Sequence, residues 1–260
     1  GLRKGAMFAY RAVYVIVFRE FKRFFSQRGR LVVTLIRPLI WLVIVGSGFT
    51  KLIDVKSGPQ YIQFILPGIV GMTVLFSSIF STMSVVWDRE FGFLREMLVS
   101  PVPRTAIVFG KLISGTALSA FQATALLFLA PALGLSLSLE GFIVSVLLIC
   151  LVAVAITSLG LFVASLLTSL EGFNVIMNFI VLPMFFLSGA LYPVDALPWA
   201  LRAVTFINPL SYGIDSFKHI LLPHGGRLSA ELPLAIDIAF VAVFSVIMIA
   251  LTALVFEKRK

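Results

Sequence analysis

The sequence predicts an all-α integral membrane protein: six transmembrane helices, an N-terminal amphipathic interfacial helix and an outer re-entrant helical hairpin before the last span. Of its 260 residues, 60% are hydrophobic and only 13% are charged, whereas about a quarter of the residues are charged in a soluble domain. The mean hydropathy is +1.07. Apolar runs of the length that crosses a bilayer recur along the whole chain, which excludes a soluble fold.

Residues 1–30 form an amphipathic stretch ahead of the first span. Apolar and basic side chains recur at helical spacing on opposite sides of a helical wheel. The apolar side holds Tyr10, Val13, Val17, Phe21 and Phe24, and the basic side holds Arg19, Lys22 and Arg23. We expect a helix that lies along the inner leaflet with its basic face toward the headgroups. It would act as a topology anchor, as a lever on the first span, or as both.

Six apolar runs follow, and each is long enough to cross the membrane as a helix of about 20 residues. They are residues 31–50, 61–87, 105–134, 141–167, 173–191 and 233–256. A spanning strand needs only about 9–11 residues, and the alternating pattern of a barrel strand is missing from these runs. The sequence therefore predicts helices rather than strands.

The positions of Lys and Arg predict the orientation. Fifteen of the 21 lie in the N-terminal stretch, in the region 88–111 and in the C-terminal tail, whereas five lie in the loops of the other side. Because basic loops remain in the cytoplasm, we expect both termini to be cytoplasmic, which agrees with an even number of spans. Arg37 falls inside the first span, close enough to the inner surface for its guanidinium to reach it.

The loop after the second span, residues 88–104, carries charges of both signs. With the residue before it, the loop reads WDREFGFLREMLVSPVPR. On a helical wheel, Trp87, Phe91, Leu94 and Leu98 share one side, Asp88, Arg89, Arg95 and Glu96 spread over the other, and Pro101 and Pro103 end the helix. We expect a short cytoplasmic helix with its apolar side on the bundle and its polar side free to dock on a soluble protein. The alternative is an ordinary solvated turn.

Residues 192–232 are too polar and too rich in proline to span. Two stretches in this region have helical apolar spacing, and Asn208-Pro209 separates them. We expect two short helices that enter the outer leaflet partway and pack on the spans, because backbone at membrane depth has to be buried in protein. Trp199, Tyr192 and Tyr212 are suited to the membrane interface. The hairpin is either a gate or a passive plug.

Several spans carry polar side chains, which are costly in hydrocarbon unless they find partners. The second span has Thr73, Ser77, Ser81 and Ser84 on one face, and the fifth has Asn174 and Asn178 one turn apart. Gly110, Ser114, Gly115 and Ser119 in the third span allow close helix contact. Helix packing explains most of these residues; a pathway for a substrate is the alternative.

The chain lacks the residues that several other functions need. A nucleotide-binding loop requires Gly, four residues and then Gly-Lys-Ser/Thr, but Gly110-Lys111 is followed by Leu112 and has Thr105 in place of the earlier glycine. His219 and His224 are two loop histidines with no cysteine beside them, so we expect no metal site. We also expect no catalytic residues and no bound cofactor. We expect no nucleic-acid partner either, because the membrane topology accounts for the positions of the basic residues.

Two blocks of the sequence resemble one family. DREFGFLREMLVSPVPRTAIVFGK resembles the segment after the second span in the type-2 permeases of ABC exporters, a family with daunorubicin-resistance-like, nodulation-type and polysaccharide exporters. FFLSGALYPVDALPWALRAVTFINPLSYGIDSFKHIL, residues 185–221, is similar to the C-terminal pattern of that family. Lys218 stands where arginine is common, so the charge is kept and the planar fork is lost.

The resemblance implies roles for three groups of residues. The helix 88–100 would couple to a separate ATPase subunit through Asp88, Arg89, Glu90, Phe91, Leu94, Arg95, Glu96 and Leu98, with a smaller contact at Thr168–Gly172. A central pathway would be lined by Thr73, Ser77, Ser81, Asn174, Asn178, Phe179 and Phe185. An outer gate would contain Trp199, Asn208, Pro209 and Tyr212.

The resemblance also implies an assembly and an activity. We expect a permease of the bacterial inner membrane that pairs with a second copy, or with a relative, and with subunits that bind ATP and Mg²⁺. Alternating access would move a hydrophobic or amphipathic substrate outward, either a drug-like molecule, as in drug resistance, or a lipid-linked compound. The rival substrates are lipo-oligosaccharides and polysaccharides. An ATP-independent channel or secondary carrier is a further alternative, and a membrane enzyme is the least favoured.

Overall fold

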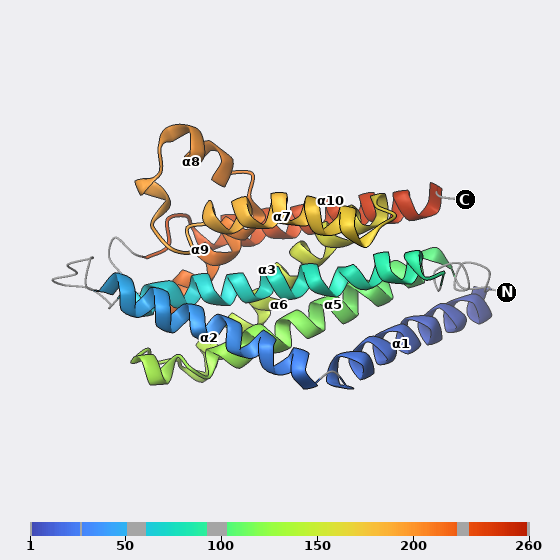
Figure 1. Cartoon of the computed structure of the whole chain (residues 1–260), viewed down its shortest axis with the longest axis horizontal. Coiled ribbons are helices and arrows are strands. Elements are labelled where there is room, and N and C mark those ends of the chain that lie inside the picture. Colours follow the sequence, from blue (N-terminus) through green and yellow to red (C-terminus); the bar gives the residue numbers. More distant parts are fainter. Residues whose placement is uncertain (1, 27, 51–60, 93–102, 223–228, 259–260) are drawn as a thin grey trace.

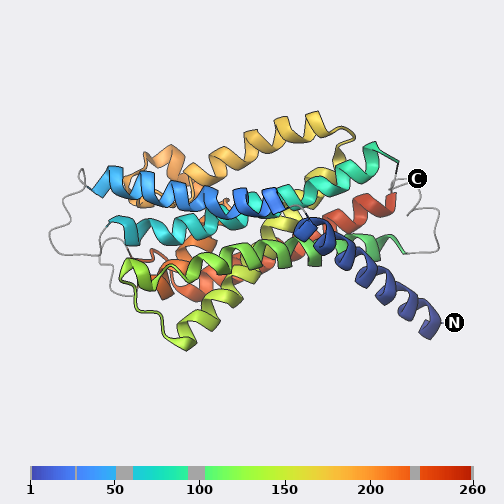
Figure 2. The same ribbon diagram turned by 60° about the horizontal axis from the view of Figure 1, so that its bottom comes forward.

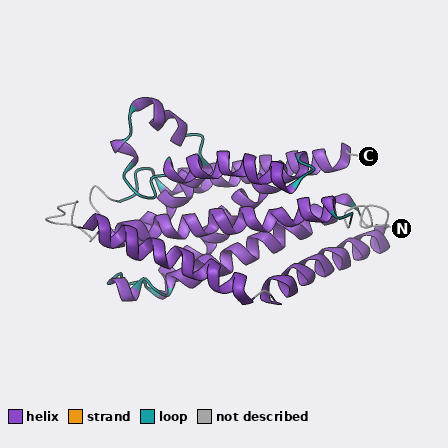
Figure 3. Cartoon of the chain, in the orientation of Figure 1, coloured by secondary structure: helices purple, strands orange, loops and turns teal. Residues whose placement is uncertain are grey.

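The computed structural model describes residues 2–26, 28–50, 61–92, 103–222 and 229–258, and over these ranges the protein is helical without strands (Figure 3). The α-helices are α1 (Leu2–Ser26), α2 (Arg28–Thr50), α3 (Tyr61–Glu90), α5 (Arg104–Leu127), α6 (Leu139–Leu166), α7 (Leu170–Phe186), α8 (Trp199–Thr205), α9 (Pro209–Leu221) and α10 (Leu234–Lys258). Two 3₁₀ helices cover Pro131–Leu133 and Val194–Ala196. The predicted all-α fold is confirmed.

The long helices run side by side along one axis, and α3 lies at the centre of the bundle (Figure 1). It packs on α2, α5, α6, α7 and α9, and its apolar stretch is the most deeply buried of the long helices. Both termini lie at the same end of the bundle, which we call the terminal end, and the opposite end is the far end (Figure 1). The end of α3 and the turn 167–169 belong to the terminal end, as do the start of α5 and the end of α10.

Among the described residues, four helices are long and apolar enough to cross a membrane: α3, α5, α6 and α10. The apolar part of α2 that the structure describes is shorter, Ile36–Gly48, and α7 has 17 residues. All six predicted runs are therefore helical, but two of them are shorter than a typical span. The fifth run, predicted over 173–191, ends early because Gly189 has φ +73° in the turn that follows α7. The third, predicted to reach 134, ends at Leu127, ahead of Pro131 and the positive-φ Gly134.

The N-terminal helix α1 leaves the bundle at an angle, with its first residues furthest out (Figure 2). Its second half packs on α5, where Ile16 lies beside Gly110 and a Cβ on that glycine would come within 3.0 Å of Ile16. The predicted apolar face is only partly the buried one. Phe24 is buried as expected, but Tyr10 is exposed, and Ile16 and Glu20 complete the buried line. This face of α1 therefore buries a charged side chain, Glu20, as well as apolar ones.

Small residues bring the central helices close together, as the third span predicts. A Cβ on Gly115 would lie 2.5 Å from Ser81 Oγ and 2.7 Å from a methyl of Thr157, so α3, α5 and α6 meet at this glycine. Ser119 Oγ donates to Val74 O at 3.1 Å and accepts from Ser78 Oγ at 3.0 Å. Gly115, Ser78 and Ser119 therefore serve helix packing, whereas Thr82 and Ser114 donate to carbonyls of their own helices.

The region after α7 contains the two short helices that the sequence predicts, α8 and α9, divided at Asn208-Pro209. The two helices pack differently. α9 lies against α6, α10 and α3 and has ten buried residues, whereas α8 stands out from the side of the bundle and has one, Thr205. Only the second half of the predicted hairpin therefore packs on the long helices, and residues 223–228 lie outside the described residues.

Candidate functional site

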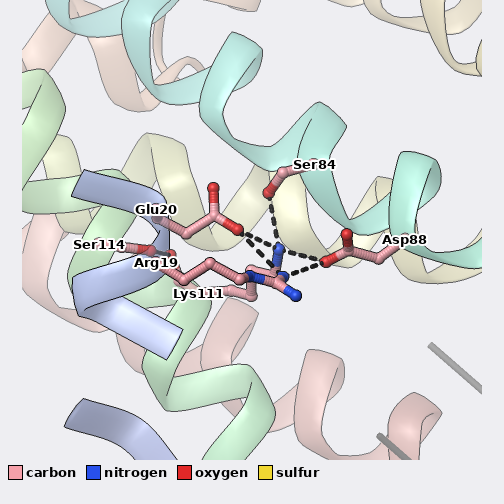
Figure 4. A network of polar contacts seen from close by, with 6 residues as sticks. All are labelled: Arg19, Glu20, Ser84, Asp88, Lys111 and Ser114. Carbon is pink, nitrogen blue, oxygen red and sulfur yellow. Dashed lines mark hydrogen bonds and ion pairs between the residues drawn. The ribbon is translucent and has the colours of Figure 1, made fainter. Parts of the chain in front are cut away.

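A buried ionic cluster joins three helices near the terminal end of the bundle (Figure 4). Lys111 of α5 is at its centre and is only 4% exposed. Its Nζ donates to Glu20 Oε1 of α1 at 2.7 Å, to Asp88 Oδ2 of α3 at 2.6 Å and to Ser84 Oγ of α3 at 2.9 Å. An ammonium has three N–H donors, so this lysine is fully hydrogen-bonded.

Arg19 completes the cluster from the edge of α1. Its Nη2 donates to Asp88 Oδ2 at 2.8 Å and lies 3.4 Å from Glu20 Oε1. Two cations and two carboxylates therefore share one site, and their formal charges cancel. A buried charge is tolerated when it is paired and its hydrogen bonds are satisfied, and here both conditions hold.

Helix geometry explains how these side chains meet. Ser84 and Asp88 are four residues apart, so they share one face of α3. Glu20 is four residues after Ile16 and four before Phe24, and it therefore shares the buried face of α1 with these two apolar residues. Lys111 lies in the second turn of α5 beside Gly110, the residue that lets α1 approach.

The two residues after Asp88 attach the end of α3 to two more helices. Arg89 donates to the carbonyls of Ser165 at 3.1 Å, Ala164 at 3.4 Å and Leu167, all at the C-terminus of α6. Glu90 Oε2 accepts from the backbone N–H of Leu170, the first residue of α7, at 3.1 Å. A cation at a helix C-terminus and an anion at an N-terminus are both favourable for the helix dipole. Residues 88–90 thus contact α1, α5, α6 and α7 immediately before the loop 91–103.

The structure changes the picture of the predicted coupling helix. Residues 88–90 are not the start of a separate helix but the last residues of α3, which continues one turn beyond Ser84. Asp88 and Arg89 were expected on a free polar side, yet both are hydrogen-bonded within the chain. Phe91 is exposed rather than packed on the bundle, and its ring contacts Trp87 with centroids 5.2 Å apart. The remaining coupling residues, Leu94, Arg95, Glu96 and Leu98, lie outside the described residues.

A cavity of about 680 Å³ opens beside the cluster, between α1, α2, α3 and α5. Glu20 and Ser84 belong to both the cluster and the cavity wall. The other lining residues are Arg23, Phe24, Gly29, Arg37, Ser77, Phe80, Ser81, Met83, Trp87, Ser114, Leu118 and Gln122. The wall thus combines aromatic and aliphatic side chains with four serine hydroxyls, one amide, two guanidinium groups and the Glu20 carboxylate.

The two arginines of the cavity lie over aromatic rings. The guanidinium of Arg37 is 4.7 Å from the centroid of Phe76, and that of Arg23 is 5.3 Å from the ring of Trp87. Stacking of this kind holds a guanidinium in place while its N–H groups remain able to donate. From the sequence, the guanidinium of Arg37 was expected to reach the membrane surface. In the structure, Arg37 also lines this cavity.

The predicted pathway residues fall in different places. Ser77 and Ser81 line the cavity, whereas Thr73 is buried and donates to Ile69 O in its own helix. On α7, Phe185 is buried, and Asn174, Asn178 and Phe179 are on the exposed face of the helix. Within this chain, therefore, α3 and α7 do not present their polar residues to one space.

The predicted gate residues mostly build the start of α9. Asn208 caps the helix, since its Oδ1 accepts from Leu210 N at 3.0 Å and its Nδ2 donates to Met184 O at 2.7 Å. Pro209 is the first residue of the helix, where a missing N–H costs nothing. Tyr212 donates to Phe206 O at 2.9 Å. Trp199, on α8, is 85% exposed.

Sequence reasoning missed Arg19, Glu20 and Lys111 as members of one site. Two signals were available: Glu20 is the only acid among the first 30 residues, and Lys111 follows Gly110 inside an apolar run. An isolated charge of each sign in such surroundings requires a partner. Glu20 and Lys111 are 91 residues apart, so no local sequence pattern indicates that they pair.

Comparison with known proteins gives one consistent result. Residues 11–222 match the profile of the family described as ABC-2 type transporter. The chain is 32% identical over 223 residues to "Putative transport permease ycf38" of Cyanophora paradoxa, covering 83% of this chain and 76% of that protein. It is 30% identical over 187 residues to "Nodulation protein J" of Rhizobium meliloti (strain 1021), with 71% of each chain covered. It is 26% identical over 216 residues to "Inner membrane transport permease YadH" of Escherichia coli (strain K12), with 81% and 82% covered.

Proposed function

Because the chain belongs to the ABC-2 type transporter family of membrane permeases, we propose that it is the membrane subunit of an ATP-driven exporter. ATP and Mg²⁺ bind to a separate ATPase subunit, since these 260 residues contain no nucleotide-binding loop. The complex lies in a bacterial inner membrane with both termini in the cytoplasm. The terminal end, with its basic residues, then faces the ATPase.

The attachment of residues 88–90 to four helices is the observation that carries this proposal. The loop that follows Glu90 is the one whose sequence resembles a coupling segment, and Asp88, Arg89 and Glu90 connect its start to α1, α5, α6 and α7. A force on the loop therefore reaches several helices through short hydrogen bonds rather than through one flexible connection. The ionic cluster transmits this force to the cavity, because Glu20 and Ser84 belong both to the cluster and to the cavity wall.

In this mechanism the ATPase subunits close on ATP and move the loops 91–103 of two permease copies together. The ends of α3 shift with the loops, and α1 and α5 follow through Lys111. The cavity then changes its access from the inner to the outer side. A substrate favours one state only by its difference in affinity for the two states, so cavity residues rather than the cluster set the specificity.

The outer face of α7 supports a second permease copy. Asn174 and Asn178 are exposed on α7 together with Val175, Ile176 and Phe179. Amide side chains on a lipid-facing surface are costly, whereas amides between helices form hydrogen bonds. Pairing of two copies along α7 would place these amides between the subunits. Asn174 and Asn178 would then line a pathway, as predicted from the sequence.

The cavity favours an amphipathic substrate. Its aromatic and aliphatic wall suits an apolar body, while Arg23 and Arg37 suit a negatively charged group, for which a guanidinium is a good partner. Acidic lipid-linked compounds match both features, and neutral drug-like molecules match the first. Lipo-oligosaccharide or polysaccharide export remains the rival function, favoured by the similarity to "Nodulation protein J".

The test is transport by the permease and its ATPase subunit in proteoliposomes. The triple change Glu90→Ala, Arg95→Ala and Glu96→Ala is expected to lower ATP-dependent transport at least tenfold without reducing membrane insertion. A matched control removes two acids and one base at the far end: Glu140→Ala, Asp195→Ala and Arg202→Ala. The control should transport like the parent protein.

Two results would overturn the proposal. Transport that survives the triple change would show that the loop 91–103 does not couple to the ATPase. Vectorial flux by the permease alone, with neither nucleotide nor ATPase subunit, would make it a channel or a secondary carrier. The substrate class is tested separately, by comparing stimulation of ATP hydrolysis by acidic glycolipids with stimulation by neutral drug-like compounds.

A further inference from the structure

A buried carboxylate without hydrogen bonds lies at the far end of the bundle. Asp237, in the first turn of α10, is 0% exposed. Neither of its carboxylate oxygens has a hydrogen-bond partner among the described residues. A carboxylate that is removed from water needs a proton, a cation or a metal ion close to it.

Two further metal-binding side chains surround this carboxylate. Asp215 and His219 are four residues apart on α9 and therefore share one face of that helix. His219 Nε2 lies 3.7 Å from Asp237 Oδ2, and one ligand atom from each of the three residues lies within 4.8 Å of the others. The backbone carbonyl of Leu232 is at hydrogen-bond distance, 2.8 Å, from the same His219 nitrogen and offers a fourth ligand atom.

The supports of this site are fixed by packing and by backbone hydrogen bonds. The Asp215 carboxylate accepts from the N–H of Glu231 at 3.0 Å and from the N–H of Leu232 at 2.8 Å, which orients it toward α10. The rings of Tyr212 and Phe240 stack with centroids 3.9 Å apart and hold α9 on α10. Hydrogen bonds that orient a ligand are typical of the surroundings of metal sites.

No hydrogen bond among the described residues joins the neighbouring lysine, Lys218, to Asp237. Lys218 Nζ lies 3.8 Å from Asp215 Oδ1, which is too long for a hydrogen bond, and it lies over the ring of Phe64 at 5.6 Å. Asp215 also lines a cavity of about 410 Å³ together with Lys218 and Glu231, which gives a small ion a route to the site.

We propose that Asp215, His219 and Asp237 bind a divalent transition-metal ion of the zinc type, with the Leu232 carbonyl as a fourth ligand. Zinc takes nitrogen and oxygen ligands at about 2.0–2.1 Å in a tetrahedron, which places two ligand atoms about 3.4 Å apart. The observed separations are 2.8 Å, 3.7 Å and up to 4.8 Å, so adjustments of up to about 1.5 Å close the site. The bound ion neutralises Asp237 and fastens α9 to α10.

This site revises the expectation that the loop histidines have no metal role. No sequence motif announces it, because its acids lie four residues before and 18 residues after His219. The proposal is independent of the transported substrate and of the ATPase, so it can fail while the proposed function stands.

The test uses the full chain in nanodiscs, purified without a polyhistidine tag and treated with a chelator. Zn²⁺ is titrated by calorimetry, and Co²⁺ serves as a spectroscopic substitute whose visible bands report its coordination. We expect one Zn²⁺ per chain and tetrahedral Co²⁺ bands. Asp237→Asn and His219→Gln should each weaken Zn²⁺ binding by more than about 100-fold, beyond the loss caused by an outer-shell partner.

His224→Gln is the matched control, because it removes the other histidine of the chain and should leave Zn²⁺ binding unchanged. If Asp237→Asn does not fold, the proposal is tested by the Co²⁺ spectrum of the parent protein and by Zn²⁺ binding to the His219→Gln variant. The proposal is overturned if the parent chain takes up no Zn²⁺, which would mean that a proton neutralises Asp237. It is also overturned if the three variants bind Zn²⁺ alike.

Discussion

Lys111 and Asp237 are both buried charges in long apolar helices, but their surroundings differ. Lys111 donates hydrogen bonds to Glu20, Asp88 and Ser84, and with Arg19 its cluster is neutral. Asp237 accepts no hydrogen bond from the described residues, and the titratable side chains beside it are His219 and the Asp215–Lys218 pair. The comparison separates a complete ionic site, which stabilises contacts between helices, from an incomplete one, for which we propose a metal ion.

The largest expected change in the free energy of unfolding concerns the ionic cluster at the terminal end, because all of its charges are paired. Lys111→Met leaves Glu20 and Asp88 buried with only the partly exposed Arg19, and breaking a buried pair in this way costs about 3–5 kcal/mol. The free energy of unfolding can be measured by reversible unfolding in mixed micelles. The control Lys22→Met removes a lysine from the exposed side of α1 and should stay within about 0.5 kcal/mol.

A double-mutant cycle sharpens this prediction. Asp88→Asn in the Lys111→Met background should recover part of the loss, because it removes one of the two charges left without an ammonium. Additive effects of the two changes would show that Lys111 and Asp88 do not interact in the membrane.

The incompleteness of the far-end site predicts an effect of opposite sign. In metal-free protein, Asp237→Asn should raise the free energy of unfolding by about 1 kcal/mol, because a neutral amide of the same shape replaces an uncompensated carboxylate. Asp195→Asn is the control, since Asp195 is exposed and paired with Arg202 at 2.7 Å. A clear loss of stability in Asp237→Asn would reveal a hydrogen-bond donor for this side chain and would remove the contrast with Lys111.

Arg89 tests whether the terminal end depends on geometry as well as on charge. Arg89→Lys keeps the positive charge but removes the guanidinium whose Nη1 donates to several carbonyls at the end of α6, and we expect a loss of about 1 kcal/mol. Arg11→Lys, on the exposed side of α1, is the control and should be neutral. Equal stability of the two variants would mean that the contribution of Arg89 depends on its charge alone.

Much of this architecture could be predicted from the sequence, because membrane helices are specified locally by length and hydropathy. The six apolar runs, the amphipathic start and the break at Asn208-Pro209 follow from neighbouring residues. The ends of α5 and α7 were less predictable, since the glycine turns after them sit inside apolar runs. Helix propensity alone does not indicate where such a turn takes over.

The site residues were harder to predict because their partners are distant in the sequence. Lys111 meets Glu20 across 91 residues, and His219 meets Asp237 across 18, so no motif connects them. A helical wheel gave Asp88 a polar side free for docking, but it could not foresee that a lysine on another helix occupies that side. Single charges inside apolar surroundings were the usable signal, and both sites contain one.

Glu90 distinguishes stability from coupling, and its expected effect on stability is the smallest. Its carboxylate is exposed and accepts one hydrogen bond from the N-terminus of α7, a contact of about 0.3–1 kcal/mol. Glu90→Gln keeps the acceptor and loses the charge, so the free energy of unfolding should fall by only a few tenths of a kcal/mol. If the end of α3 transmits movement from the loop 91–103 to α7, ATP-dependent transport should nevertheless fall several-fold. Glu140→Gln, in the first turn of α6 at the far end, should leave transport unchanged. Equal transport by the two variants would limit Glu90 to a structural cap and leave Asp88 and Arg89 to connect the end of α3 to the other helices.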